Sequence, residues 1–411
     1  MKQSPNKNLA LVLSGGGARG AYEAGVMHYI RTMLPSKARR RNFDIQSGAS
    51  VGAINTSFVA ATAHDLEFQG KEIWRLWQDL REENIYRRDK RALWDFLSRS
   101  SKGILSGLLG GKTHDSRHFN GFLDTAPFLP FIQKVVPWKQ ITQNILAGFI
   151  KAVSIVATNV FTGRTELFIE KHPSVEYTGE YIVHHGPINA LHAMASAAIP
   201  IVFPTIMIDD IAYTDGGLRL NTPMSPVIQL GADSILVIGL HHRAKPGEKI
   251  PFHGEKGKPP ALGQVMGRVM NSMFLDRIQY DMEQLDRINK IVDWGEMLYG
   301  KTFLEDLNQM LLKKKIRGDI ASRGLKKIHV LRMRPSEDIG EIFSHCYKRG
   351  RDKHFGSFEK FMVRMLDIDP AAGVDFLSYI AFMPEYLKKL LELGFEDARK
   401  NHAELKEFFE A

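Results

Sequence analysis

The sequence predicts an α/β fold with a mainly parallel central sheet and helices on its faces. Two apolar runs, Leu9 to Leu13 and Phe43 to Gln46, each lead through a glycine turn into a segment with helical spacing. The two helices are expected from about Ala21 to Leu34 and from Val51 to about Ala63. Strands that alternate with helices in this way typically form a parallel sheet. Both glycine turns are therefore expected at the same edge of that sheet.

Strand patterns return after residue 150, so the sheet is expected to extend beyond its first two strands. Two segments are spaced as a β-hairpin, Ala152 to Ala157 and Thr165 to Ile169. The next expected elements are the strands Thr205 to Ile208, Ile211 to Tyr213, Ser234 to Gly239 and Ile328 to Met333, and a helix from about Ile188 to Ala198. After Pro251 the pattern is mostly helical, with one long helix from Met270 to Val292 and several helices between Ser357 and Glu410.

This pattern divides the chain into an α/β domain over residues 8–245 and a mostly helical C-terminal region over residues 246–411. The strand at 328–333 is expected to return to the core sheet. A helical insertion at about 64–145 interrupts the first domain and is rich in aromatic residues. It is either a cap over a site or a set of ordinary packed helices. Its segment from Leu105 to Leu109 is the piece most suited to contact an apolar ligand.

The amino-acid composition limits the classes of protein to which this chain can belong. The 411 residues are 44% hydrophobic and 25% charged, which is typical of a globular chain with a large core. The single cysteine, Cys346, excludes an internal disulfide and a thiolate metal cluster. The polar start, Met1 to Asn8, lacks the apolar core of a secretory signal, and the longest apolar stretch, Ile145 to Phe161, is interrupted by polar residues. We therefore expect a soluble, cytoplasmic protein.

The chain is basic, with a formal net charge of +9. Its basic residues come in short groups, at 37–41, 87–91 and 313–315. Each group is either a solvated helix end or a surface for anionic lipid headgroups, so peripheral contact with an anionic membrane is one expectation. The sequence contains no recognised nucleic-acid-binding motif, so no nucleic-acid partner is expected.

The first glycine turn, Gly15-Gly16-Gly17-Ala18-Arg19-Gly20, allows two interpretations. Its spacing fits a dinucleotide-binding loop, but that motif also needs an acidic residue at the end of the second strand, and Asp44 lies at its start. The alternative is a cradle of backbone N–H groups at a helix N-terminus, which favours a developing oxyanion. Arg19 either strengthens this positive field or ties the loop to the sheet, and we favour the structural role.

The second glycine turn contains Gly48-x-Ser50-x-Gly52. A serine between a strand and a helix can be lifted clear of the sheet as a nucleophile. It then needs a base. One candidate is a histidine, for which His241-His242 after a strand is the best placed pair, in the manner of a Ser–His–Asp esterase. The other is Asp215, which would need burial to raise its pKa towards neutrality.

These motifs together, and in this order, resemble the patatin-like phospholipase family. The matching residues lie in the glycine loop from Gly15 to Gly20, in Gly48-Ala49-Ser50-Val51-Gly52, in Asp215-Gly216-Gly217 and in the segment from Ala195 to Pro200 with Phe203-Pro204. The resemblance covers roughly residues 8 to 240. It implies a three-layer α/β/α fold and a Ser50–Asp215 dyad without histidine. The backbone of Gly15, Gly16 and Gly17 would form the oxyanion hole, and neither metal nor cofactor would be needed.

The resemblance further implies hydrolysis of fatty-acyl esters, in phospholipids or related lipids. Three alternatives stay open at this point. They are a Ser–His–Asp esterase, a lipid-binding protein that keeps the fold without catalysis, and a nucleotide-binding oxidoreductase that uses the first glycine loop.

Overall fold

The computed structural model describes residues 7–87, 121, 123–242, 277–314, 326–350 and 374–410. The segment from Leu105 to Leu109 and most of the middle of the 64–145 insertion lie outside these described residues.

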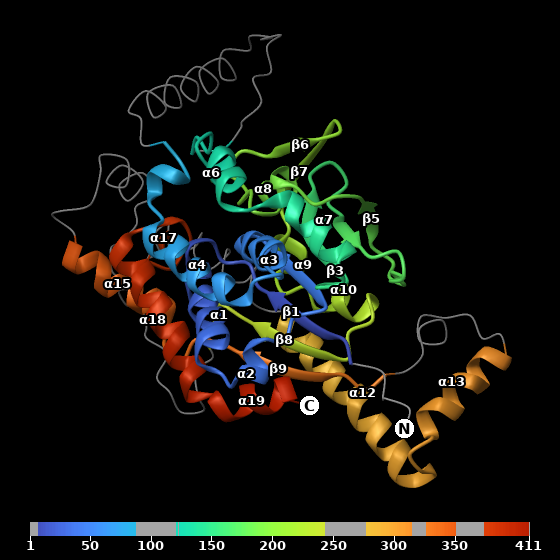
Figure 1. Ribbon diagram of the computed structural model, residues 1–411. Coiled ribbons are helices and arrows are strands. Elements are labelled where there is room, and N and C mark those ends of the chain that lie inside the picture. Colours follow the sequence, from blue (N-terminus) through green and yellow to red (C-terminus); the bar gives the residue numbers. More distant parts are fainter. Residues whose placement is uncertain are drawn as a thin grey trace, which may run out of the picture.

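A nine-stranded sheet forms the centre of the molecule, in the order β5-β4-β3-β2-β1-β8-β9, with β7 and then β6 added beside β3 (Figure 1). Its strands are β1 Leu9–Leu13, β2 Ile45–Ala49, β3 Ala152–Asn159, β4 Thr165–Lys171, β5 Ile182–His185, β6 Ile206–Ile208, β7 Ile211–Asp215, β8 Ser234–Ile238 and β9 His329–Met333. The central strands from β3 through β2, β1 and β8 to β9 are parallel neighbours. The prediction of a mainly parallel sheet is confirmed, and the pair β3–β4 is the expected antiparallel hairpin.

The helices cover both faces of this sheet. They are α1 Ala21–Met33, α2 Ser36–Arg39, α3 Val51–Ala61, α4 Leu66–Asp79, α6 Phe128–Val135, α7 Trp138–Leu146, α8 Ala190–Ser196, α9 Gly217–Leu220, α10 Met224–Gln229, α12 Arg277–Tyr299, α13 Phe303–Lys313, α15 Ile339–Gly350, α17 Val374–Ile380, α18 Pro384–Lys400 and α19 His402–Glu410. Two short 3₁₀ helices are η1 Gly17–Gly20 and η2 Glu82–Asn84.

Several elements differ from the sequence-based expectation, and three of these differences affect the sheet near the glycine turns or at its edge. The second strand was expected over Phe43 to Gln46, but β2 runs from Ile45 to Ala49, because its pairing with β1 and β3 continues through the small residues after Gln46. β7 likewise continues to Asp215, which pairs with β3. The short edge strand β5 was not expected, since its exposed residues lack an apolar pattern.

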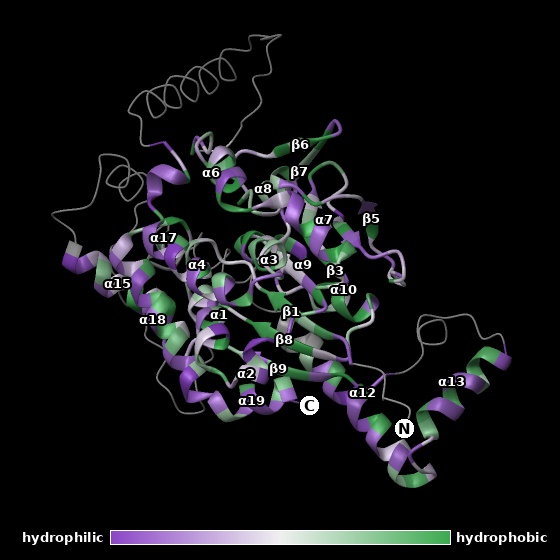
Figure 2. Cartoon of the chain, viewed as in Figure 1, coloured by the Kyte–Doolittle hydropathy of each residue, from purple (hydrophilic) through white to green (hydrophobic). Residues whose placement is uncertain are grey.

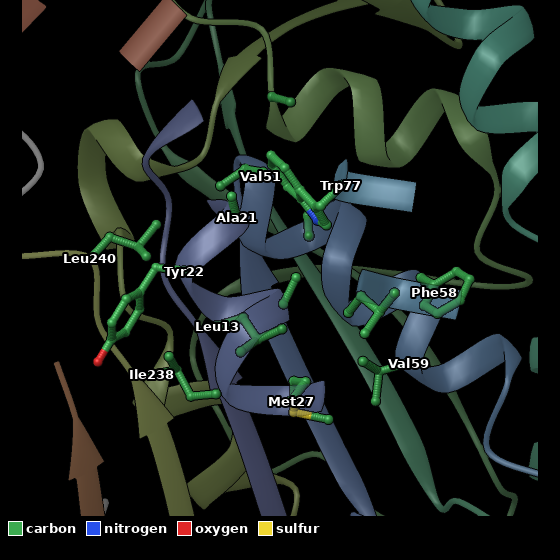
Figure 3. Packing of buried hydrophobic residues seen from close by; sticks show 14 of the residues in the cluster. Leu13, Ala21, Tyr22, Met27, Val51, Phe58, Val59, Trp77, Ile238 and Leu240 are labelled. Carbon is green, nitrogen blue, oxygen red and sulfur yellow. The ribbon is translucent and has the colours of Figure 1, made fainter. Parts of the chain in front are cut away.

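The alternation of side chains along β1 divides the core into two clusters. Leu9, Leu11 and Leu13 join a large cluster with α1, α3, α4 and the C-terminal helices α15 and α17 to α19. Ala10 and Val12 point to the other face and join a second cluster with α9, α10 and α12. Figure 3 shows part of the first cluster, and Figure 2 shows the apolar central strands between more polar helices. The fold is therefore a three-layer α/β/α arrangement.

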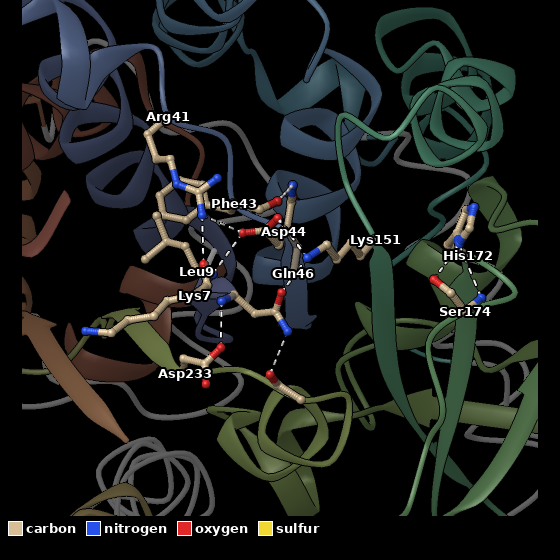
Figure 4. A network of polar contacts seen from close by, with 12 residues as sticks. Lys7, Leu9, Arg41, Phe43, Asp44, Gln46, Lys151, His172, Ser174 and Asp233 are labelled. Carbon is tan, nitrogen blue, oxygen red and sulfur yellow. Dashed lines mark hydrogen bonds and ion pairs between the residues drawn. The ribbon is translucent and has the colours of Figure 1, made fainter. Parts of the chain in front are cut away.

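A polar network joins the strands at the edge where they begin (Figure 4). The Asp44 carboxylate accepts hydrogen bonds from the Leu9 N–H and the Arg41 guanidinium, both at 2.9 Å, and lies 3.6 Å from the Lys151 ammonium. Asp44 thus links the starts of β1, β2 and β3. This structural role is inconsistent with a ribose ligand at that position.

The C-terminal helices belong to the same core as the sheet. α18 packs along α1 (Figure 1), and glycines make the contact close. A Cβ atom at Gly25 would lie 2.1 Å from the Leu391 carbonyl oxygen, and one at Gly394 would lie 2.1 Å from the Tyr22 carbonyl oxygen. The residues on both sides of the expected domain boundary at 245 therefore contribute side chains to the same hydrophobic core.

Adding a methyl group at this contact should destabilise the protein. We expect Gly25→Ala and Gly394→Ala each to lower the free energy of unfolding by about 1–3 kcal/mol, because the two backbones must separate. Thermal denaturation measures this. The matched control is Gly239→Ala, whose Cβ would meet its nearest atom at an ordinary 3.8 Å. Equal melting temperatures for all three variants would contradict the close packing.

Candidate active site

Ser50 lies at the junction of β2 and α3 in a strained backbone conformation. Its φ of 52° and ψ of −127° are rare for a residue with a side chain and cost roughly 1–3 kcal/mol. The flanking glycines make the turn possible. A Cβ at Gly48 would lie 2.2 Å from the Gly52 carbonyl oxygen, and one at Gly52 would lie 2.3 Å from the Leu13 carbonyl oxygen. The sequence pattern around Ser50 is therefore a requirement of local geometry.

Ser196 holds this strained turn in place. The Ser50 N–H donates to the Ser196 hydroxyl at 2.8 Å, and the Gly216 N–H donates to the Ser196 carbonyl at 3.2 Å. Ser196 is fully buried at the end of α8. One residue therefore joins the segments that carry Ser50 and Asp215. Sequence reasoning noted its segment only as part of a family resemblance and gave its hydroxyl no role.

The structure brings Asp215 directly to Ser50, although 165 residues separate them in the chain. Asp215 ends β7, opposite Ala157 of β3, where the Thr158 hydroxyl donates to its backbone carbonyl at 2.9 Å. The Ser50 hydroxyl donates to Asp215 Oδ2 at 2.6 Å, a length typical of a hydrogen bond to a carboxylate. The other carboxylate oxygen accepts from the Gly217 N–H at 2.7 Å.

Burial gives the Asp215 carboxyl the properties of a base. The residue is 0% exposed, and this desolvation raises its pKa from 3.8 to about 7. The hydrogen bonds from Ser50 and Gly217 oppose the rise because they favour the charged form. The carboxyl is therefore about half ionised near neutral pH, which suits proton transfer at that pH.

The first glycine turn lies against Ser50. A Cβ at Gly15 would be 2.8 Å from the Ser50 Cβ atom. The Gly15 N–H, however, donates to the Asn221 carbonyl at 3.1 Å, so the expectation that Gly15 is an oxyanion donor does not hold in this structure. Gly16 caps η1 and Gly17 is its first residue, and no described residue accepts a hydrogen bond from their N–H groups. Gly17 has a φ of 57°, and a Cβ there would lie 2.0 Å from the Tyr379 carbonyl oxygen.

The Arg19 side chain anchors this loop to the C-terminal part of the chain. Its guanidinium is buried and donates to the Ser378 hydroxyl at 3.0 and 2.6 Å and to the Tyr379 hydroxyl at 3.2 Å. It also stacks 3.9 Å from the centre of the Tyr379 ring. These contacts fit the structural role that we favoured. They tie the loop to α17, a C-terminal helix, and not to the sheet as we expected.

The candidate histidine pair takes no part in the Ser50 contact. Among the described residues, no histidine forms a hydrogen bond with Ser50 or Asp215. His242 instead contacts the Pro335 carbonyl through Nδ1 at 3.1 Å. The direct 2.6 Å contact leaves no room for an imidazole between serine and aspartate.

An apolar pocket opens beside Ser50. It is lined by Gly17 and Ser50, by side chains of α3 and α4, by Phe128 and Val135 of α6, and by Phe203 and Phe382. The polar groups in its wall are paired with one another. The Trp77 indole N–H donates to Asn55 at 2.9 Å, and Asn55 donates to the buried Glu23 at 2.8 Å. The pocket therefore suits a hydrocarbon chain.

Comparison with known proteins identifies the family of this chain. A family model described as patatin-like phospholipase matches residues 11–228, more than half of the chain. The chain belongs to the patatin-like phospholipase family. Its fold and its sequence resemblance to this family are both confirmed.

The chain is also similar to a curated protein, the cGAMP-activated phospholipase of Pseudomonas aeruginosa strain BWHPSA011 / Pa011. It is 30% identical over 215 residues, which are 52% of this chain and 53% of that protein, so the match spans about half of each. Among solved structures, VipD from Legionella pneumophila matches over 93% of this chain and 92% of its own, at 13% identity and a TM-score of 0.29. That similarity is too low to support an argument.

Two further features bear on this patatin-like chain. Over the described ranges, no helix combines the length and apolar character needed to cross a bilayer. In the same ranges, no three His, Cys, Asp or Glu side chains are grouped so as to hold a metal ion.

The buried carboxyl should make stability depend on pH in a defined direction. Its folded pKa of about 7 exceeds the ordinary 3.8, so ionisation costs stability progressively as pH rises from about 4 to 7. We expect Asp215→Asn to melt several degrees higher than wild type at pH 8 and at nearly the same temperature at pH 4. Each pKa unit corresponds to about 1.4 kcal/mol. A pH-independent difference between the two proteins would contradict the raised pKa.

Proposed function

We propose that this protein is a serine acyl hydrolase that cleaves fatty-acyl esters of phospholipids or related lipids through a Ser50–Asp215 dyad. The observation that carries the proposal is the 2.6 Å hydrogen bond from a strained serine to a buried aspartate at the mouth of an apolar pocket. Membership in the patatin-like phospholipase family supports the same chemistry.

In the first step, Ser50 Oγ attacks the ester carbonyl carbon and its proton passes to Asp215 Oδ2. The carbonyl oxygen becomes an oxyanion, which the Gly16 and Gly17 N–H groups would stabilise. Each such donor is worth roughly 3–4 kcal/mol in the transition state. α3 begins at Val51, directly after Ser50, and the dipole at its N-terminus also favours the negative charge on the oxyanion. When the intermediate collapses, the proton on Asp215 passes to the leaving alcohol, and an acyl-serine remains.

In the second step, a water molecule attacks the acyl-serine and gives its proton to Asp215. The resulting intermediate expels Ser50 Oγ, which takes the proton back, and the fatty acid leaves. Asp215 is thus base and then acid in both steps. No external oxidant, reductant or metal enters this balance.

The apolar pocket supports a long acyl chain as the part of the substrate that is recognised. α4 and α6 of the 64–145 insertion contribute side chains to its wall. We therefore propose that the insertion forms part of the acyl-binding cap. We further propose that the protein is cytoplasmic and that it contacts anionic membranes peripherally. The membrane contact is supported by the basic charge of the chain and by the lipid nature of the proposed substrates.

Removing either member of the dyad should abolish hydrolysis while the fold stays intact. We expect Ser50→Ala and Asp215→Asn each to reduce fatty-acid release by about 10³-fold or more. The measurement is fatty acid released from phospholipid, lysophospholipid and triacylglycerol substrates.

The control for this experiment is the double variant His241→Ala/His242→Ala, which should retain activity. Loss of activity in that variant and in Ser50→Ala, with activity retained in Asp215→Asn, would favour a Ser–His–Asp esterase. Wild-type protein that releases no fatty acid from any substrate would favour a non-catalytic lipid-binding protein.

The rate of hydrolysis should depend on the length of the acyl chain, because that chain binds in the apolar pocket. Each methylene group that enters it contributes up to about 0.8 kcal/mol, so kcat/KM should rise from short to medium p-nitrophenyl esters. Leu76→Asn places an amide in the wall and should lower the decanoate-to-acetate ratio roughly tenfold. The control is Leu146→Asn at a 69% exposed position outside the pocket. Equal ratios in both variants would rule out acyl binding there.

A further inference from the structure

A second, polar pocket lies at the opposite ends of the helices that begin at the active site. It is formed where α1 and α3 end and α4 begins, together with α2 and Phe149. α1 begins beside the glycine loop and α3 begins after Ser50. Helices of 13 and 11 residues are about 20 and 16 Å long. The polar pocket is therefore distinct from the acyl pocket.

Arg31 lies in the wall of this polar pocket as a buried cation. Only 2% of the residue is exposed. Its Nε donates to Gln69 at 2.7 Å, and its Nη1 donates to the carbonyls of Arg39 and Arg41 at 3.1 and 2.8 Å. Within the part of the chain that the structure describes, its Nη2 has no hydrogen-bond partner and no carboxylate pairs with the guanidinium. A buried charge without a counter-ion is costly unless an anion approaches it.

Two further arginines line the polar pocket without an ion pair. Arg39 is half-buried and Arg40 is exposed, and neither side chain contacts a carboxylate among the described residues. The acidic residues nearby are already engaged. Asp65 accepts from the Phe68 N–H at 2.9 Å as the cap of α4, and Glu67 pairs with Lys71 at 2.6 Å. The pocket therefore has an excess of positive charge.

We propose that this polar pocket is a binding site for a phosphate-bearing anion. Arginine guanidinium groups match phosphate oxygens with paired N–H donors, and Arg31, Arg39 and Arg40 all line this pocket. Phe149, 43% exposed at the same pocket, provides apolar surface for the organic part of a phosphoester. The shared chemistry covers a soluble phosphoester and a phosphate-bearing lipid headgroup.

This site is independent of the hydrolytic chemistry, so it can be tested in the Ser50→Ala protein. The test variant is Arg39→Gln/Arg40→Gln in that background. Arg31 is left unchanged because its guanidinium also bonds the two carbonyls that hold the turn after α2. The control is Lys388→Gln/Lys389→Gln, which removes the same charge from the exposed side of α18.

Two probes separate the sources of the anion. Inorganic pyrophosphate is titrated calorimetrically against potassium chloride of equal ionic strength, and phosphatidylcholine vesicles with and without phosphatidic acid are used for sedimentation. We expect saturable binding of at least one probe, a loss of at least tenfold in affinity for the arginine variant, and wild-type affinity for the lysine control. Pyrophosphate binding indicates a soluble ligand, and vesicle binding alone indicates a headgroup. Binding of neither probe, or equal losses in both variants, overturns the proposal.

Discussion

The hydrogen bond between the Ser50 hydroxyl and the buried Asp215 carboxylate is the interaction on which the arrangement of the site depends. It requires β2 and β7 to end next to each other along the same side of β3, where β2 pairs as far as Val156 and Asp215 of β7 pairs with Ala157. Ser196 then fixes the distance, because it bonds to the backbone on both sides of the contact. The sheet order and one serine together define the geometry of the dyad.

Two energetically unfavourable features therefore lie side by side at this site. The Ser50 backbone is strained, and the Asp215 carboxyl is held in a medium that disfavours its charge. Such features persist only where the surrounding structure is stable enough to impose them. Here the surroundings are the central parallel strands and α3, whose buried side chains belong to the large core cluster.

The C-terminal helices contribute to the site, although they lie far from it in the sequence. Arg19 binds the glycine loop to α17, and the Tyr379 carbonyl oxygen occupies the space where a Gly17 side chain would be. α18 is held against α1, which follows that loop. The conformation of the loop that faces Ser50 thus depends on residues outside the segment matched by the family model, 11–228.

The sequence by itself determined the strand–glycine–helix units and the parallel sheet, because glycine turns and strand periodicity are local properties of the backbone. It also gave Ser50 as a candidate nucleophile and Asp215 as one of two candidate bases, and the family resemblance favoured Asp215. Only the tertiary structure decided which N–H groups face the nucleophile, since the Gly15 N–H is taken by a carbonyl of Asn221, 206 residues away. It also decided the partners of Arg19 and the role of Ser196. These depend on how distant backbone segments approach one another, and no local pattern of residues encodes that approach.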